Sequence, residues 1–159
     1  MKHLPKHLRP RWRYLAVGIE AWPDAEISRG SFQRELWYAA QNLLGDPGSA
    51  DASLSVLRFE FENGSGETVV RVRRGEVEPA RAALACLDEV DGQPVGLRVR
   101  GVSGTVRAAS ERYLGRGAGV SDQRSVVFEN TERTAFERDS ALDVRRPSGF
   151  AGATELDLE

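Results

Sequence analysis

The chain has 159 residues, of which 40% are hydrophobic, enough for one domain with its own core and an appendage. No apolar run approaches the length of a membrane span, and the basic stretch 1–13 lacks the apolar segment of a signal peptide. The single cysteine, Cys86, excludes an internal disulfide framework. These features predict a cytoplasmic globular protein.

Charge is distributed unevenly along the chain. Of the 22 basic residues, 20 are arginine, and only Lys2 and Lys6 are lysine. Residues 1–116 hold 17 basic and 15 acidic residues, whereas residues 117–159 hold 5 and 9. A lysine-poor, acid-rich composition favours an origin in a salt-loving archaeon, and a GC-rich genome is the alternative explanation.

The first half predicts an arm, a strand, a helix and a hairpin. Residues 1–10 contain two prolines and no periodicity, which indicates an arm, and the alternation in 11–20 predicts a strand. Helical spacing runs over 31–45, with Ser31 as a possible N-cap and Gly45 as a stop. Two strands, 53–61 and 68–74, flank Asn63-Gly64, a strong hairpin signal.

The next elements are a helix over 76–90, a strand over 94–100 and a third helix over 103–114. The order β-α-β-β-α-β-α predicts an α+β, ferredoxin-like (RRM-like) domain over 11–115, with two helices on one face of a four-stranded antiparallel sheet and an extra C-terminal helix. Residues 116–159 are dominated by Gly, Ser, Asp and Arg, and we expect an acidic, mostly disordered tail of low order.

The two faces of the predicted sheet differ in chemistry. Because helices must cover the more apolar face, that face takes Leu15, Val17, Ile19, Leu57, Phe59, Phe61, Leu97 and Val99. The other face then carries five arginines and two aromatic residues: Trp12, Tyr14, Arg58, Arg71, Arg73, Arg98 and Arg100. Arginines interleaved with aromatic rings suit a polyanion with bases to stack, such as RNA. A solvated, salt-bridged surface is the alternative.

The strand-to-helix turn at 103–105 adds exposed backbone N–H groups, which can cap the helix and can also bind phosphate. The predicted RNA-binding residues are Arg9, Arg11, Arg13, Tyr14, Arg58, Arg71, Arg73, Arg98, Arg100, Ser103, Thr105 and Arg107.

Catalytic patterns are weak. His3 and His7 lie in a proline-containing arm, which disfavours a metal site. The string "GVSGT" lacks the second glycine of a nucleophile elbow, since Thr105 stands there. Cys86 lies among alanines and is expected to be a small core residue. We therefore expect no catalytic residues and no metal bound by the protein.

Three stretches carry a family resemblance: "LPKHLRPRWRYLAVGI", "FQRELWYAAQNLLG" and "RVRRGEVEPARAALACLDEVDGQPVGLRVRGVSGTVRAA". Together they resemble the ribonuclease P protein component 2 family of archaea and eukaryotes, over residues 4–114. The resemblance implies a non-catalytic subunit of an RNA-based endoribonuclease that removes the 5′ leader from precursor tRNA. It also implies Mg²⁺ on the RNA subunit, and, as partners, the ribonuclease P RNA and component 3, a TIM-barrel-like protein, in a heterotetramer of two such pairs.

Two other functions remain open at this stage. One is a general RNA-binding module unconnected to tRNA processing, which the basic arm fits, although the aromatic signature of common RNA-recognition domains is missing from 67–74. The other is a ferredoxin-like ligand-binding regulatory domain. The third helix can also fold back over the arginine-bearing face and cover part of it.

Overall fold

The computed structural model describes residues 4–115, 120, 122–139, 141–147 and 149–158. A short 3₁₀ helix, η1 (Lys6–Leu8), precedes the first domain. The elements that follow are β1 (Trp12–Ala21), α1 (Arg29–Ala52), β2 (Ser55–Glu62), β3 (Ser65–Arg73), α2 (Val77–Ala85), β4 (Glu89–Val90), β5 (Gln93–Ser103) and α3 (Val106–Tyr113).

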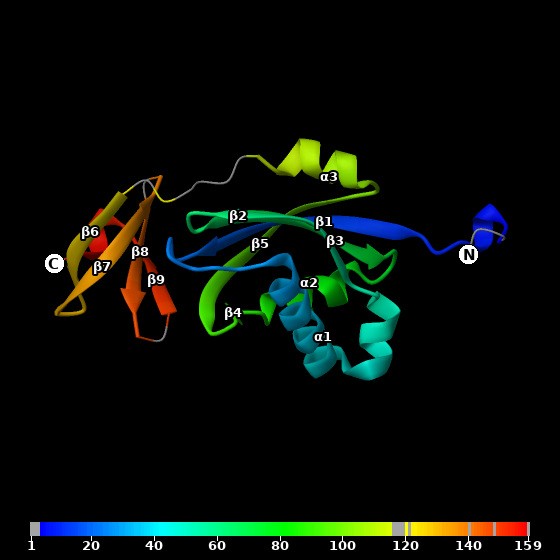
Figure 1. Cartoon of the computed structure of the whole chain (residues 1–159), viewed down its shortest axis with the longest axis horizontal. Helices are drawn as coiled ribbons and strands as arrows, with labels where there is room; N and C mark the ends of the chain where they lie inside the picture. Colours follow the sequence, from blue (N-terminus) through cyan, green and yellow to red (C-terminus); the bar gives the residue numbers. More distant parts are fainter. Residues whose placement is uncertain (1–3, 116–119, 121, 140, 148, 159) are drawn as a thin grey trace.

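The domain is built on one antiparallel sheet with the strand order β2-β3-β1-β5-β4. Helices α1 and α2 lie on one face, and α3 lies across the other (Figure 1). Apart from the two-residue strand β4 at one edge, this is the order of a ferredoxin-like fold, so the predicted fold is confirmed.

The core lies between the sheet and the α1–α2 layer because the central strand β1 is apolar on that face. Leu15, Val17 and Ile19 are at most 1% exposed and pack with Phe32 and Leu36 of α1. Burial of such side chains contributes roughly 1.5–3 kcal/mol each, so this layer supplies most of the stability of the domain.

Helix α1 starts earlier and ends later than predicted. Ser28 is the N-cap, and it exchanges hydrogen bonds with Ser31 in a capping box. Gly45, with φ +73°, interrupts the helix as expected, but Pro47 lies in the first turn of a further helical segment that runs to Ala52. The result is a kinked helix rather than a stop.

Helix α2 is shorter than predicted. It ends at Ala85, and the chain then forms the short strand β4, which turns at Asp91 and Gly92 into β5. Cys86 follows the last helical turn and is exposed, so the prediction that it is a small core residue is wrong.

The predicted division of the sheet faces is confirmed except in β2. A register shift between Val56 and Phe59 places Val56 in the core, fully buried, whereas Leu57 is only partly buried. Phe59, Phe61, Leu97 and Val99 pack against the core as expected. A bulge inserts an unpaired residue that alternation alone does not reveal.

The expectation of a mostly disordered tail is wrong for the described residues. They form a second antiparallel sheet, the C-terminal sheet, with strands β6 (Asp122–Phe128), β7 (Thr131–Arg138), β8 (Ala141–Arg146) and β9 (Gly149–Ala153) in sequential order, followed by η2 (Glu155–Asp157). Its small core is Val126, Ala135, Leu142, Val144 and Ala153. These apolar residues alternate with polar ones, a pattern that the overall composition of the segment concealed.

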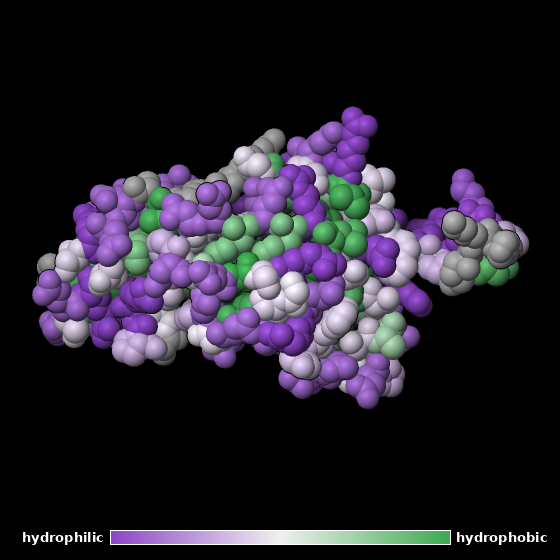
Figure 2. Space-filling view, viewed as in Figure 1, coloured by the Kyte–Doolittle hydropathy of each residue, from purple (hydrophilic) through white to green (hydrophobic). Residues whose placement is uncertain are grey.

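The C-terminal sheet packs on the end of the first domain that is distant from the N-terminal arm (Figure 1). Trp22, directly after β1, contacts Phe136 and Phe150 with ring centroids 5.2 and 4.8 Å apart. Arg138 is 6% exposed; it donates to the Ala21 and Gly64 carbonyls and pairs with Asp143 at 2.7 Å. The face of this sheet in view is mostly hydrophilic (Figure 2).

Candidate RNA interface

An aromatic ring surrounded by arginines lies at one end of the β1–β3 pair. Trp12 is opposite Arg73 in the register, and the Arg71 guanidinium lies 4.1 Å from the Trp12 ring centroid. Arg73 lies 5.9 Å from the same centroid. We define the Trp12 surface as this tryptophan with the five arginines at the paired ends of β1 and β3: Arg11, Arg13, Arg71, Arg73 and Arg74. Arg71 and Arg73 contact the ring, the Arg74 N–H donates to the Arg11 carbonyl, and Arg13, opposite Val72, alternates to the other face of β1. A guanidinium on a tryptophan face is held by cation–π attraction, so its N–H groups keep a fixed direction.

The charge of the Trp12 surface is not neutralised within the described part of the chain. None of its five arginines pairs there with a carboxylate, whereas other surface arginines do, as in Arg58–Glu60 at 3.1 Å and Arg107–Glu111 at 2.8 Å. Five positive charges on one end of a sheet need an anionic partner to become neutral, and phosphates fit the guanidinium fork.

Helix α3 covers much of the sheet face that was expected to be open. Tyr14 packs there with Tyr113 in a small cluster formed by Ala16, Val69, Ala109 and Leu114. The sequence left open whether the third helix folds back over this face; in the structure it does, and Tyr14 is accordingly only partly exposed.

Arg100 is held beneath α3 instead of facing solvent. It pairs with Glu67 at 2.7 Å and donates to the Tyr113 carbonyl at 3.3 Å. The Glu67 carboxylate also accepts a hydrogen bond from the Gly115 N–H. These contacts bind the C-terminal end of α3 to the sheet, so Arg100 has a structural role.

The turn before α3 caps the helix as expected. The Thr105 side chain accepts a hydrogen bond from the Ala108 N–H at 3.1 Å. Ser103 is 9% exposed and therefore offers little surface to RNA. Arg13 reaches this turn, since an ideal β-carbon at Gly104 would lie 3.9 Å from its Nη1.

The other predicted RNA-binding residues are scattered. Arg9 is exposed in the arm, and its Nε donates to the Leu4 carbonyl. Arg58 is on the edge strand β2, Arg98 is exposed on β5, and Arg107 is on the outer side of α3. The structure thus brings Arg71 and Arg73 together at the Trp12 ring, places Arg11 and Arg13 at the same strand end, and leaves Arg58 and Arg107 apart.

Three surface residues were missing from the predicted set: Trp12, Arg74 and Arg112. Trp12 and Arg74 could have been predicted from the sequence, because each is next to a residue of the predicted RNA-binding set. Arg112 could not, because its place depends on how α3 folds back onto β5.

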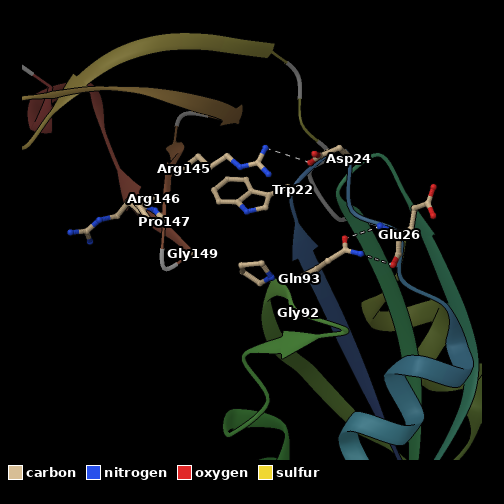
Figure 3. A pocket seen from close by; sticks show the side chains of 10 residues that line it. Trp22, Asp24, Glu26, Gly92, Gln93, Arg145, Arg146, Pro147 and Gly149 are labelled. Carbon is tan, nitrogen blue, oxygen red and sulfur yellow. Dashed lines mark hydrogen bonds and ion pairs between the residues drawn. The ribbon is translucent and has the colours of Figure 1, made fainter.

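A different hollow, about 550 Å³ in volume, lies where the C-terminal sheet meets the first domain. Two interactions cross this hollow (Figure 3). Arg145, above Trp22, pairs with Asp24 at 3.6 Å, and the Gln93 side chain bonds to the backbone of Glu26. Since both of its arginines are already paired with carboxylates, Arg145 with Asp24 and Arg146 with Glu129, this hollow is a poorer candidate site for an anion than the Trp12 surface.

No group of three His, Cys, Asp or Glu residues that could hold a metal ion occurs within the described ranges. In the same part of the chain, none of the helices has the length and apolar character needed to cross a membrane.

A ferredoxin-like sheet that carries un-neutralised arginines around an aromatic ring defines a class of protein suited to bind RNA. Comparison with known proteins gives the family. Residues 13–114 match the model of the Rpp14/Pop5 family, and the chain belongs to that family. This confirms the family resemblance found in the sequence.

Relatives with the name "Ribonuclease P protein component 2" match over different lengths. The chain is 62% identical to one from Halorubrum lacusprofundi over 159 residues, covering all of both chains, and 59% identical to one from Haloarcula marismortui over 160 residues, covering 99% of both. It is 39% identical to one from Methanosarcina mazei over 114 residues, covering 72% of this chain and 93% of that relative.

Both of these full-length matches are to halophilic archaea, which favours the salt-loving explanation of the composition. They also extend through the C-terminal sheet, which the family model does not cover.

Proposed function

We propose that this protein is a subunit of ribonuclease P, which supports the catalytic RNA in removing the 5′ leader from precursor tRNA. The observation that carries the proposal is the end-to-end match to relatives with the name ribonuclease P protein component 2. The Trp12 surface supplies the RNA-binding chemistry that such a role requires.

The reaction itself is assigned to the RNA. In this proposal Mg²⁺ is bound by the RNA subunit, and the protein contributes neither a nucleophile nor a general base. Its contribution is to stabilise the folded, active RNA by neutralising phosphates that approach one another.

Arg71 and Arg73 are the central RNA contacts in this proposal. Their guanidinium groups are oriented by Trp12 and can each donate two directed hydrogen bonds to a phosphate. Arg11, Arg13 and Arg9 extend the basic surface toward the N-terminal arm. Phosphate contacts made by arginine tolerate salt better than a diffuse charge attraction, because they depend on short-range geometry.

The expected protein partner is component 3, a TIM-barrel-like protein, in a heterotetramer of two pairs within the cytoplasm. The outer side of α1 and α2 and the C-terminal sheet remain available to such partners when RNA is bound at Trp12. Trp12 shares the α3 face of the sheet with Tyr14, α1 and α2 cover the opposite face, and the C-terminal sheet lies at the end distant from the N-terminal arm (Figure 1).

The test is reconstitution of precursor-tRNA cleavage from ribonuclease P RNA, Mg²⁺, component 3 and this protein. Wild-type protein should stimulate cleavage, and the double variant Arg71→Ala/Arg73→Ala should lose most of that stimulation. Arg81→Ala is the matched control, since Arg81 is an exposed arginine of α2, on the opposite face of the sheet, paired with Glu78. Absence of stimulation by the wild type, or equal binding to unrelated RNA, would refute the proposal.

A further inference from the structure

A basic groove lies between α3 and β5, separate from the Trp12 surface. Arg98, Val99, Arg100, Arg112 and Tyr113 line it, and its volume is about 330 Å³. We refer to it as the α3 groove. Its size is at the lower end of ligand pockets, which hold roughly 300–1,000 Å³.

The floor of the α3 groove is an ion pair between two strands. Arg100 and Glu67 form an ion pair whose side chains are only 22% and 20% exposed, and Arg100 also bonds to the end of α3. Gly18 makes this possible, because an ideal β-carbon there would lie 2.7 Å from Arg100 Nη2. The charge of Arg100 is therefore neutralised before any ligand arrives.

Two further arginines leave the groove positively charged. Arg98 comes from β5 and Arg112 from the last turn of α3, and both are exposed. Neither pairs with a carboxylate among the residues that the structure describes. The helix dipole accounts for a basic residue in the last turn of α3, but it does not account for a second arginine in the same groove from a different element.

We propose that the α3 groove binds one phosphodiester of an RNA strand, with Arg98 and Arg112 as the two donors and Tyr113 as an aromatic wall. The proposal rests on the proposed function. Two guanidinium groups from different elements are a typical clamp for a phosphate, whose oxygens accept several charge-assisted hydrogen bonds at once.

The groove and the Trp12 surface lie at opposite ends of α3. Arg13 reaches the turn that begins the helix, whereas Arg112 is in its last turn. A helix of eight residues is about 12 Å long, so one RNA strand that follows α3 can reach both sites.

The experiment compares full-length wild-type protein with Arg98→Ala, Arg112→Ala and the double variant. Arg81→Ala is the control, because Arg81 is an exposed arginine of α2, paired with Glu78 and outside the groove. The probe is a fluorescent single-stranded decauridylate, titrated over the salt range in which circular dichroism shows all variants folded.

We expect roughly a tenfold loss of affinity in the double variant, and a salt slope that is smaller by about 0.7 for each phosphate that the variant no longer neutralises. Arg81→Ala should bind as the wild type does. Equal affinity and equal slope for the double variant and the wild type would refute the groove site.

Two further outcomes distinguish a failure of the groove proposal from a failure of the proposed function. If wild-type protein stimulates cleavage by ribonuclease P RNA but the double variant does so equally, only the groove proposal fails. An oligoglutamate peptide can also bind more tightly than decauridylate, with that binding lost in the double variant. The groove then binds an acidic protein segment, and the proposal that it binds a phosphodiester is wrong.

Discussion

At the scale of single residues, the chain uses arginine for two different purposes. Arg100 is held inside the fold by Glu67 and Tyr113, whereas Arg71 is half-buried and lies against the Trp12 ring. Sequence alternation placed both on the same face and gave no reason to separate them. The difference comes from their partners, because Arg100 bonds to the end of α3 and Arg71 stacks on Trp12.

Arg71→Lys should weaken the stimulation of precursor-tRNA cleavage at molar salt nearly as much as Arg71→Ala. A lysine keeps the charge but loses the planar stacking on Trp12 and the forked pair of donors. Arg74→Lys is the control, because Arg74 is exposed and has no ring contact. Full stimulation by Arg71→Lys, together with loss in Arg71→Ala, would show that charge alone matters.

Glu67→Ala should destabilise the protein by about 1–3 kcal/mol, because it leaves Arg100 partly buried without its partner and frees the end of α3. Urea denaturation followed by circular dichroism measures the change. Glu60→Ala serves for comparison, since it removes the partner of the exposed Arg58 and should cost less than about 1 kcal/mol. Similar losses in both variants would contradict the structural role of Arg100.

At the scale of elements, local patterns predicted every helix and every long strand of the first domain. Alternation and helical spacing are properties of neighbouring residues, and they identified Leu15, Val17 and Ile19 as core. The bulge in β2, the strand β4 and the position of α3 were not predicted, because each depends on how distant segments pair.

The bulge in β2 has a measurable consequence. Val56→Ala should lower the free energy of unfolding by about 2 kcal/mol, because Val56 is fully buried. Leu57→Ala removes a larger side chain but should cost less, since Leu57 is only partly buried. Thermal or urea unfolding of the two variants tests the register of β2. A greater loss of unfolding free energy in Leu57→Ala than in Val56→Ala would place Leu57 in the core instead.

At the scale of the whole molecule, the C-terminal sheet and the first domain are joined by a buried arginine and an aromatic cluster. Composition predicted disorder here because the segment is acidic and rich in small residues. The alternation of Val126, Leu142 and Val144 with polar neighbours, and the contacts of Trp22, supply the apolar surface that composition alone did not reveal.

Arg138 joins the C-terminal sheet to the first domain, so replacing it should have a predictable effect. Arg138→Met leaves Asp143 without its partner and removes the donors to the Ala21 and Gly64 carbonyls, which should cost about 3 kcal/mol. The small core of the C-terminal sheet cannot absorb this loss, whereas the first domain has its own larger core. Hydrogen exchange should therefore show reduced protection across 122–158 and unchanged protection across 12–103.

Arg124→Met is the control, because Arg124 pairs with the exposed Glu155 at the surface of the same sheet, and it should leave both regions protected. Unchanged protection of 122–158 in Arg138→Met would mean that the aromatic contacts of Trp22 alone hold the sheet in place.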